Sequence, residues 1–308
     1  MQNVSGDSMR ASDILGSYGI IATAAFVLGL LIGGFPIFAS EITIVSLAVM
    51  MALSLSNVTI GRGVLRGTAR PTLLAFLLNY VLLTGLILAM AFLFDEELGA
   101  GWVLMAAVPS AVAVVPFTYM LGGDTRLSLV GTTAIYLLSL IIAPLITIVF
   151  LGQAMDRFRL LYTIILMILI PIAISQLPAL RKMGSSTKTP LVNICFGVLV
   201  FTMTGANRSA FTEDLSMVFW VSLASFVRTF LIGMIILAAS RALRQPAERG
   251  VVLVLFSSYK NLGLTAALAM ALIGSTAAIP ATICIPFEIF WLIALKRLMR
   301  VSRTMPEH

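Results

Sequence analysis

The chain has 308 residues, of which 60% are hydrophobic and 11% are charged, and its formal net charge is +7. Soluble domains carry roughly 25% charged residues, so this composition excludes a soluble globular protein and predicts a polytopic membrane protein. The basic residues lie in short segments between apolar runs, which is typical of membrane topology. We therefore expect contact with the lipid bilayer and no binding of nucleic acid.

Apolar runs of membrane-spanning length recur along the whole chain. A spanning helix needs about 20 predominantly apolar residues, and on this criterion the sequence predicts an all-α membrane protein with ten transmembrane helices. The expected spans are roughly 15–38, 41–57, 71–94, 98–121, 127–152, 159–180, 189–207, 215–240, 247–273 and 276–296.

The charges between the spans indicate the orientation. If the N-terminus is cytoplasmic, most of the 20 basic residues fall in the inner loops and the acidic segment 95–97 falls outside. This satisfies the positive-inside rule. We expect both termini to be cytoplasmic, and the protein to lie in the inner (plasma) membrane of the cell.

Ten spans divide into two five-helix repeats, 1–152 and 153–308. Because five is odd, the second repeat enters the membrane from the opposite side, which is the arrangement of an inverted repeat. Helix-weakening residues interrupt the fourth span at Pro109–Pro116 and the ninth span at Ser257–Gly263. Paired interruptions at matching positions are typical of transporter binding sites, so we expect two broken helices that cross near the midplane.

Three charged residues, Arg228, Lys260 and Glu288, lie well inside predicted spans. A charge at the bilayer centre costs at least about 2.5–3.5 kcal/mol on insertion scales. One acid cannot neutralise two cations, so we assign the remaining positive charge to Lys260. It could bind an anion, or carry a proton because desolvation favours the neutral amine. Alternatively, Lys260 snorkels to the cytoplasmic side and Arg228 is only a structural partner.

Enzyme chemistry finds little support in the sequence. The only histidine is His308, the last residue, and Glu288 is the only acid that lies well inside a span. We find neither a cluster with metal-ligand spacing nor a glycine-rich phosphate loop. We therefore expect no enzymatic activity, no cofactor and no metal site.

Two stretches resemble motifs of the bile acid:sodium symporter superfamily. They are Lys260–Ala269 with Pro280, and Pro109–Tyr119 with Gly123, Leu127, Ser128, Thr132, Ala143 and Pro144. The resemblance implies a bacterial or archaeal homologue with a core domain of helices 3–5 and 8–10 and a panel domain of helices 1, 2, 6 and 7. It also implies that broken helices 4 and 9 cross in the core and that substrate binds between core and panel.

The resemblance also exposes departures at the family's sodium site. Positions that carry a Ser-Asn pair in bacterial members read Val114-Val115, and the bridging glutamate of the ninth helix appears as Phe256. The glutamine before the motif asparagine appears as Lys260, whose ammonium would repel Na⁺ by about 4 kcal/mol at 4 Å and an effective dielectric of 20. We expect a degenerate sodium site in which Lys260 replaces the cation.

Other family positions are kept or replaced by similar residues. The third-helix glutamine reads Asn79, and two sodium ligands remain as Ser128 and Thr132, although helix–helix hydrogen bonding would also explain these three polar residues. The residues expected to bind substrate or couple transport are Lys260, Asn261, Ser257, Ser258, Tyr259, Asn79, Ser128, Thr132, Val114, Val115 and Pro116, with Arg228 and Glu288 as intramembrane charge partners.

These observations predict a secondary active transporter that moves a small organic anion by alternating access, either proton-linked or uncoupled. Bile-acid-like amphipaths, keto acids and pantoate-like acids remain candidate substrates. One alternative is a sodium-dependent bile-acid-type symporter with a rearranged site. An arsenite- or auxin-efflux-like carrier is disfavoured because the fourth span has no cysteine. An alternative of another class is a non-transporting membrane sensor or scaffold.

Overall fold

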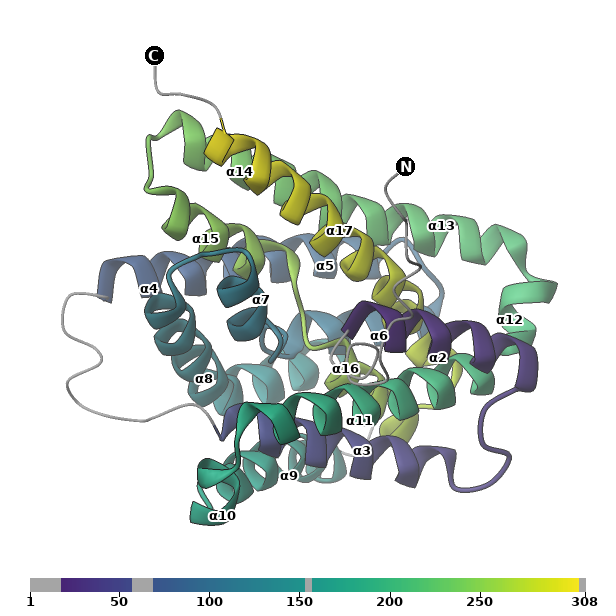
Figure 1. The fold of residues 1–308 in the computed structure, drawn as a ribbon. Helices are drawn as coiled ribbons and strands as arrows, with labels where there is room; N and C mark the ends of the chain where they lie inside the picture. Colours follow the sequence, from purple (N-terminus) through teal and green to yellow (C-terminus); the bar gives the residue numbers. More distant parts are fainter. Residues whose placement is uncertain (1–17, 57–68, 153–156, 305–308) are drawn as a thin grey trace, which may run out of the picture.

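The computed structural model describes residues 18–56, 69–152 and 157–304, and every regular element in these ranges is a helix (Figure 1). In chain order these are α2 (Tyr18–Ile32), α3 (Ala39–Leu55), α4 (Ala69–Phe76), η1 (Leu77–Leu83), α5 (Thr84–Ala91), α6 (Glu96–Ala107), α7 (Val114–Met120), α8 (Thr125–Leu151), α9 (Arg157–Ser175), α10 (Pro178–Lys182), α11 (Ser185–Ala206), α12 (Arg208–Glu213), α13 (Leu215–Phe226), η2 (Val227–Leu231), α14 (Ile232–Ala242), α15 (Ala247–Ser258), α16 (Leu262–Leu272), η3 (Thr276–Ala278) and α17 (Ile279–Thr304). The expected all-α class is confirmed.

Six helical runs in the described residues are long and apolar enough to cross a membrane. They are Ala69–Ala91, Thr125–Leu151, Ser185–Ala206, Leu215–Ala242, Ala247–Leu272 and Thr276–Met299. Three shorter apolar helices, Tyr18–Ile32, Ala39–Leu55 and Leu161–Ser175, accompany them. The chain is therefore a multi-pass membrane protein, and its lipid-facing surface explains the many exposed leucine, isoleucine and phenylalanine side chains.

Polar side chains set the beginnings of four helices. Asp95, Asp124 and Asp214 each accept a hydrogen bond from the backbone amide three residues further on, at 2.8–2.9 Å, and so begin α6, α8 and α13. Asn261 begins α16 in the same way, with Oδ1 3.0 Å from the amide of Leu264. These side chains satisfy amides that have no acceptor within the helix.

The two expected broken helices are present, but each break is shorter than predicted. One chain segment is interrupted between Ala107, where α6 ends, and Val114, where α7 begins. Pro116 was expected to belong to this break and instead lies in the first turn of α7. The amides of a first helical turn need no intrahelical acceptor, so a proline is tolerated there.

The second break covers only the three residues between α15 and α16, Tyr259–Asn261. Ser257 and Ser258, which we expected to loosen the helix, are its last two residues. Their hydroxyl groups donate to the carbonyl of Val254 at 2.9 and 2.6 Å. Such back-bonding lets serine remain helical in an apolar environment.

Two long helical runs contain a wider π-helical turn, η1 in Ala69–Ala91 and η2 in Leu215–Ala242. Each places a polar side chain in the protein interior, Asn79 in η1 and Arg228 in η2, and both side chains are fully buried. Single π turns within α-helices occur frequently at functional sites. Here they position two of the residues that surround the second break.

The helices on either side of the two broken helices form two groups, one with α2, α3, α9 and α11 and the other with α13 and α17. Helix α11 contacts α2 and α3, and α3 contacts α9. Helices α6 and α16 lie between this group and α13 and α17, as Figure 1 shows, and α16 contacts both α3 and α6. The interrupted helices therefore lie at the centre of the molecule.

The close approach of α6 to η3 gives a test of this packing. A Cβ atom added at Gly101 would lie 2.1 Å from the carbonyl oxygen of Ala277, whereas one added at Gly85 would meet nothing within 4 Å. Overpacking of a core typically costs about 1–3 kcal/mol, and more where backbone must move. We expect Gly101→Ala to lower the melting temperature in detergent and Gly85→Ala to leave it unchanged or slightly raised. Equal melting temperatures for the two variants would contradict the packing.

Candidate functional site

The two breaks meet at the centre of the protein. The backbone amide of Asn261 donates to the carbonyl of Pro109 at 2.9 Å, which joins the second break to the first. The side-chain amide of Asn261 also donates to the hydroxyl of Tyr136 on α8 at 2.8 Å. Asn261 thus begins α16 and holds both breaks against α8.

The ammonium group of Lys260 lies inside a cage of oxygen atoms. Its Nζ is 2.9 Å from Oγ1 of Thr84, 3.0 Å from the carbonyl of Val108, 3.1 Å from that of Ala106 and 3.3 Å from Oδ1 of Asn79. The ring centroid of Tyr80 lies 4.6 Å away, within reach of a cation–π interaction. The side chain is completely buried.

The broken helix itself supplies much of this cage. Ending α6 at Ala107 leaves its last carbonyls without intrahelical donors, at the negative end of the helix dipole. Lys260 donates to two carbonyls at this end, those of Ala106 and Val108. An ammonium has three donors and no acceptor, whereas the Thr84 hydroxyl already has two carbonyl acceptors for its own proton. The cage therefore offers acceptors that match the donors of an ammonium.

Asn79 performs the corresponding task for the other broken helix. Its amide nitrogen donates to the carbonyl of Phe256 at 2.9 Å and to that of Tyr259 at 3.3 Å, where α15 ends. Its Oδ1 accepts from Lys260. Asn79 therefore holds the end of α15 and, through Lys260, is connected to the end of α6.

The intramembrane acid pairs with Arg228 and not with Lys260. Arg228 Nη2 contacts Oε1 of Glu288, and this is the only ion pair in which both partners belong to the described part of the chain. The same carboxylate oxygen accepts from the backbone amide of Lys260 at 3.3 Å. The Lys260 ammonium is consequently balanced by neutral oxygen atoms and the helix end, without a carboxylate.

The remaining expected site residues lie either at the second break or on α8. Tyr259 and Ser258 tie the second break to α17, because the Tyr259 hydroxyl donates to the carbonyl of Glu288 at 2.8 Å and Ser258 Oγ accepts from the indole of Trp291 at 3.0 Å. Ser128 accepts from Thr118 on α7 at 3.0 Å. The buried hydroxyl of Thr132 has no hydrogen-bond partner in the described part of the chain.

Apolar side chains occupy two positions at which the family resemblance described above implies sodium ligands. Val114 is buried on α7, and Phe256 is buried on α15. The ring of Phe256 packs against Gly131, where an added Cβ would lie only 3.0 Å from two ring carbons. Gly131 lies between Ser128 and Thr132 in α8, so the aromatic ring approaches the backbone that carries both retained hydroxyl groups.

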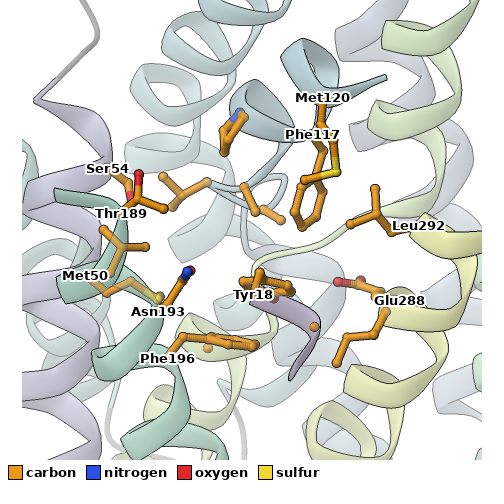
Figure 2. Close-up of a pocket in the computed structure, with 18 of the residues that line it drawn as sticks. Tyr18, Met50, Ser54, Phe117, Met120, Thr189, Asn193, Phe196, Glu288 and Leu292 are labelled. Atoms are coloured by element: carbon orange, nitrogen blue, oxygen red, sulfur yellow. The ribbon is translucent and has the colours of Figure 1, made fainter. Parts of the chain in front are cut away.

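A cavity of about 1570 Å³ opens beside the point where the two breaks meet. Its walls come from α2, α3, α7, α8, α11, the start of α16 and α17 together with the residues of both breaks, and Figure 2 shows the labelled side chains pointing into it. Most of the lining is apolar, and Val115, Pro116 and Thr132 belong to it. The charged members of the described lining are Lys188, Lys260, Lys296 and Glu288. Such a cavity can hold an organic molecule.

Several site residues had no usable signal in the sequence. Ala106 and Val108 act through main-chain carbonyls, which depend on where α6 ends. Thr84 follows Asn79 by five residues, and only the wide turn of η1 brings both to the same ammonium. Tyr18 and Lys296 line the cavity from opposite ends of the chain. The apolar surroundings of Thr84 and Tyr18 made neither residue conspicuous.

Comparison with known proteins identifies the family. A family model described as the Sodium Bile acid symporter family matches residues 42–207, slightly more than half of the chain. The chain belongs to this family. None of the curated proteins matches it. The family match contains Asn79, Val114, Val115, Ser128 and Thr132 but ends before Lys260. Members of the family are membrane transporters and not enzymes, so the protein is a membrane transporter of the bile acid symporter type.

Proposed function

We propose that this family member carries a small organic anion across the membrane by alternating access and does so without coupled sodium. The observation that carries the proposal is the cage around Lys260, in which an ammonium tethered to the chain has four oxygen neighbours. A sodium ion is bound by oxygen atoms in the same manner. Coupling is then proton-linked or absent.

The proposed architecture has ten spans in two inverted repeats, with the N- and C-termini in the cytoplasm and the protein in the plasma membrane. The contacts among α2, α3, α9 and α11 support a panel domain made of these helices. The cavity between them and the broken helices supports a substrate site between panel and core. Rocking of one group against the other would expose this site alternately to the two sides.

The charge of the cavity supports an anionic substrate. Three basic residues and one acid line it, and the acid is already paired with Arg228. Mostly apolar walls surround these charges, where electrostatic attraction is screened less than in water. An anion with an apolar body matches both features.

Transport in the absence of sodium tests the proposal. In proteoliposomes that contain the purified protein, we expect taurocholate, pantoate or 2-oxoisovalerate to be taken up at the same rate in Na⁺ as in choline medium. A ligand at 100 times its Kd also stabilises the protein by about 2.7 kcal/mol, so the active anion should raise the melting temperature equally in both media. A sodium-coupled symporter of the family is the positive control. Sodium-stimulated uptake would instead favour a rearranged sodium site.

A further inference from the structure

Glu288 occupies an unusual position for an acid in an anion carrier. Among the described residues that line the cavity it is the only acid, and Figure 2 shows its carboxyl group directed into the cavity from α17. The side chain is 8% exposed. A substrate anion in this cavity would therefore meet a carboxylate as well as the basic lining residues.

The contacts of Glu288 leave it both held in place and accessible. Its two polar contacts, with the guanidinium of Arg228 and the amide of Lys260, use the same oxygen, Oε1. Arg228 lies outside the described lining of the cavity, whereas the Glu288 side chain reaches the cavity surface. The titratable and charged groups around it are Arg228 on η2, Lys260 and Tyr259 in the second break, Cys284 one turn earlier on α17 and Tyr18 on α2.

Charge balance decides what happens when an anion enters. With all three groups ionised and no substrate bound, Arg228, the caged Lys260 and Glu288 carry a combined charge of +1. An anion arriving alone would place a second negative group beside the Glu288 carboxylate, and like charges at short range raise the proton affinity of such a group. An anion arriving with a proton leaves the combined charge of the site at +1, because the carboxylate becomes a neutral acid and the Arg228 guanidinium then faces the substrate anion.

We propose that Glu288 is a proton-binding site, which takes up one proton from solution when an anion binds in the cavity, so that proton and anion move together. The inference rests on the proposed function and assigns the coupling to a residue of the cavity wall. Lys260 remains an ammonium throughout the cycle. The only bond formed is the O–H bond of the Glu288 carboxylic acid, and it breaks again when the anion leaves.

The proton also weakens the contacts that connect α17 to η2 and to the second break. A neutral carboxylic acid attracts the Arg228 guanidinium and the amide of Lys260 less strongly than a carboxylate does. Protonation of Glu288 therefore loosens the connection between α17, η2 and the second break, while the bond from Asn261 to Pro109 persists. Binding and movement are linked through the same side chain.

The first experiment measures taurocholate binding to the purified protein between pH 5 and 8. The sulfonate of this probe stays ionised over this range, so any pH dependence comes from the protein. Linkage of one proton to one anion predicts that affinity rises by up to about tenfold for each unit by which the pH falls. In weakly buffered solution, a pH-indicator dye should report an uptake approaching one proton for each anion bound. Binding that is flat with pH and takes up no proton would overturn the proposal.

Variants assign the proton to its residue. We expect Glu288→Gln, which resembles the protonated acid, to bind taurocholate with an affinity independent of pH and without proton uptake. Because this change leaves a buried Arg228 without its carboxylate, the double variant Arg228→Gln/Glu288→Gln is tested alongside and should show the same pH independence. Glu248→Gln, at an exposed position in the first turn of α15, should keep the pH dependence of the unmodified protein.

The outcomes separate the two proposals. If taurocholate, pantoate and 2-oxoisovalerate all fail to bind the unmodified protein at any pH, the proposed function fails and the inference fails with it. If an anion binds without pH dependence, only the role of Glu288 is overturned. If both glutamine variants keep the pH dependence, the proton binds elsewhere. Loss of all binding in both variants would indicate that Glu288 holds a cationic part of the substrate, which also contradicts the proposal.

Discussion

Replacing Lys260 by alanine should abolish most anion uptake while the protein still inserts into the membrane. The four oxygen atoms of the cage lose a charged donor, and hydrogen bonds to a charged group are worth about 1.5–3 kcal/mol each. Loss of two such bonds from one transport conformation corresponds to a fall in rate of at least about 100-fold. Uptake by proteoliposomes, normalised to the amount of folded protein, measures this effect.

Rescue of the Lys260→Ala variant distinguishes a tethered cation from a purely structural lysine. The shortened side chain leaves space lined by Asn79, Thr84 and the carbonyls of Ala106 and Val108. Methylammonium can restore both the charge and the donors there, and we expect it to recover part of the uptake. Lys182→Ala, which removes an exposed lysine from α10, is the matched control and should behave as the unmodified protein. Full uptake by Lys260→Ala without added amine would contradict a role for the cage.

The largest loss of stability is expected for Arg228→Ala. Arg228 is fully buried and forms an ion pair with Glu288, which is itself nearly buried. Removing one partner of a buried pair leaves an uncompensated charge and typically costs 3–5 kcal/mol. We expect the melting temperature in detergent to fall by roughly 10 °C.

A surface arginine and a double variant make this measurement specific. Arg241 lies exposed on α14, in the same helical run as Arg228, and Arg241→Ala should change stability by less than about 0.5 kcal/mol. The double variant Arg228→Gln/Glu288→Gln removes both charges and should be more stable than Arg228→Ala. If Arg228→Ala and Arg241→Ala melt at the same temperature, the buried pair makes no net contribution to the native state.

The sequence predicted the helical class and both broken helices because these depend on local properties. Hydropathy is a sum over neighbouring residues, and proline or glycine acts on its own turn. The same reasoning misplaced the ends of the breaks. Pro116 suits the first turn of α7, and Ser257 and Ser258 satisfy their hydroxyl groups within α15, so none of the three interrupts a helix.

The partners of the site residues could not be predicted, since they depend on how the helices pack. The sequence showed that one acid faces two cations, but only the packing of α17 against η2 assigns Glu288 to Arg228. Regular helical periodicity fails in η1 and η2, because a π turn shifts every later side chain relative to an α-helix. The grouping of Asn79 with Thr84 is therefore invisible to a pattern search.

A cation fixed to the chain also determines which energy sources the proposed transporter can use. A sodium ion that binds and leaves in each cycle transfers part of its gradient to the substrate, whereas Lys260 remains in the protein and transfers none. The membrane potential acts on a lone anion with about 2.3 kcal/mol per 100 mV and drives it out of a negatively charged interior. An anion that moves together with a proton carries no net charge across the membrane, so the potential does not act on it and the pH gradient drives it. Export or accumulation would then be decided by one carboxyl group on the cavity wall.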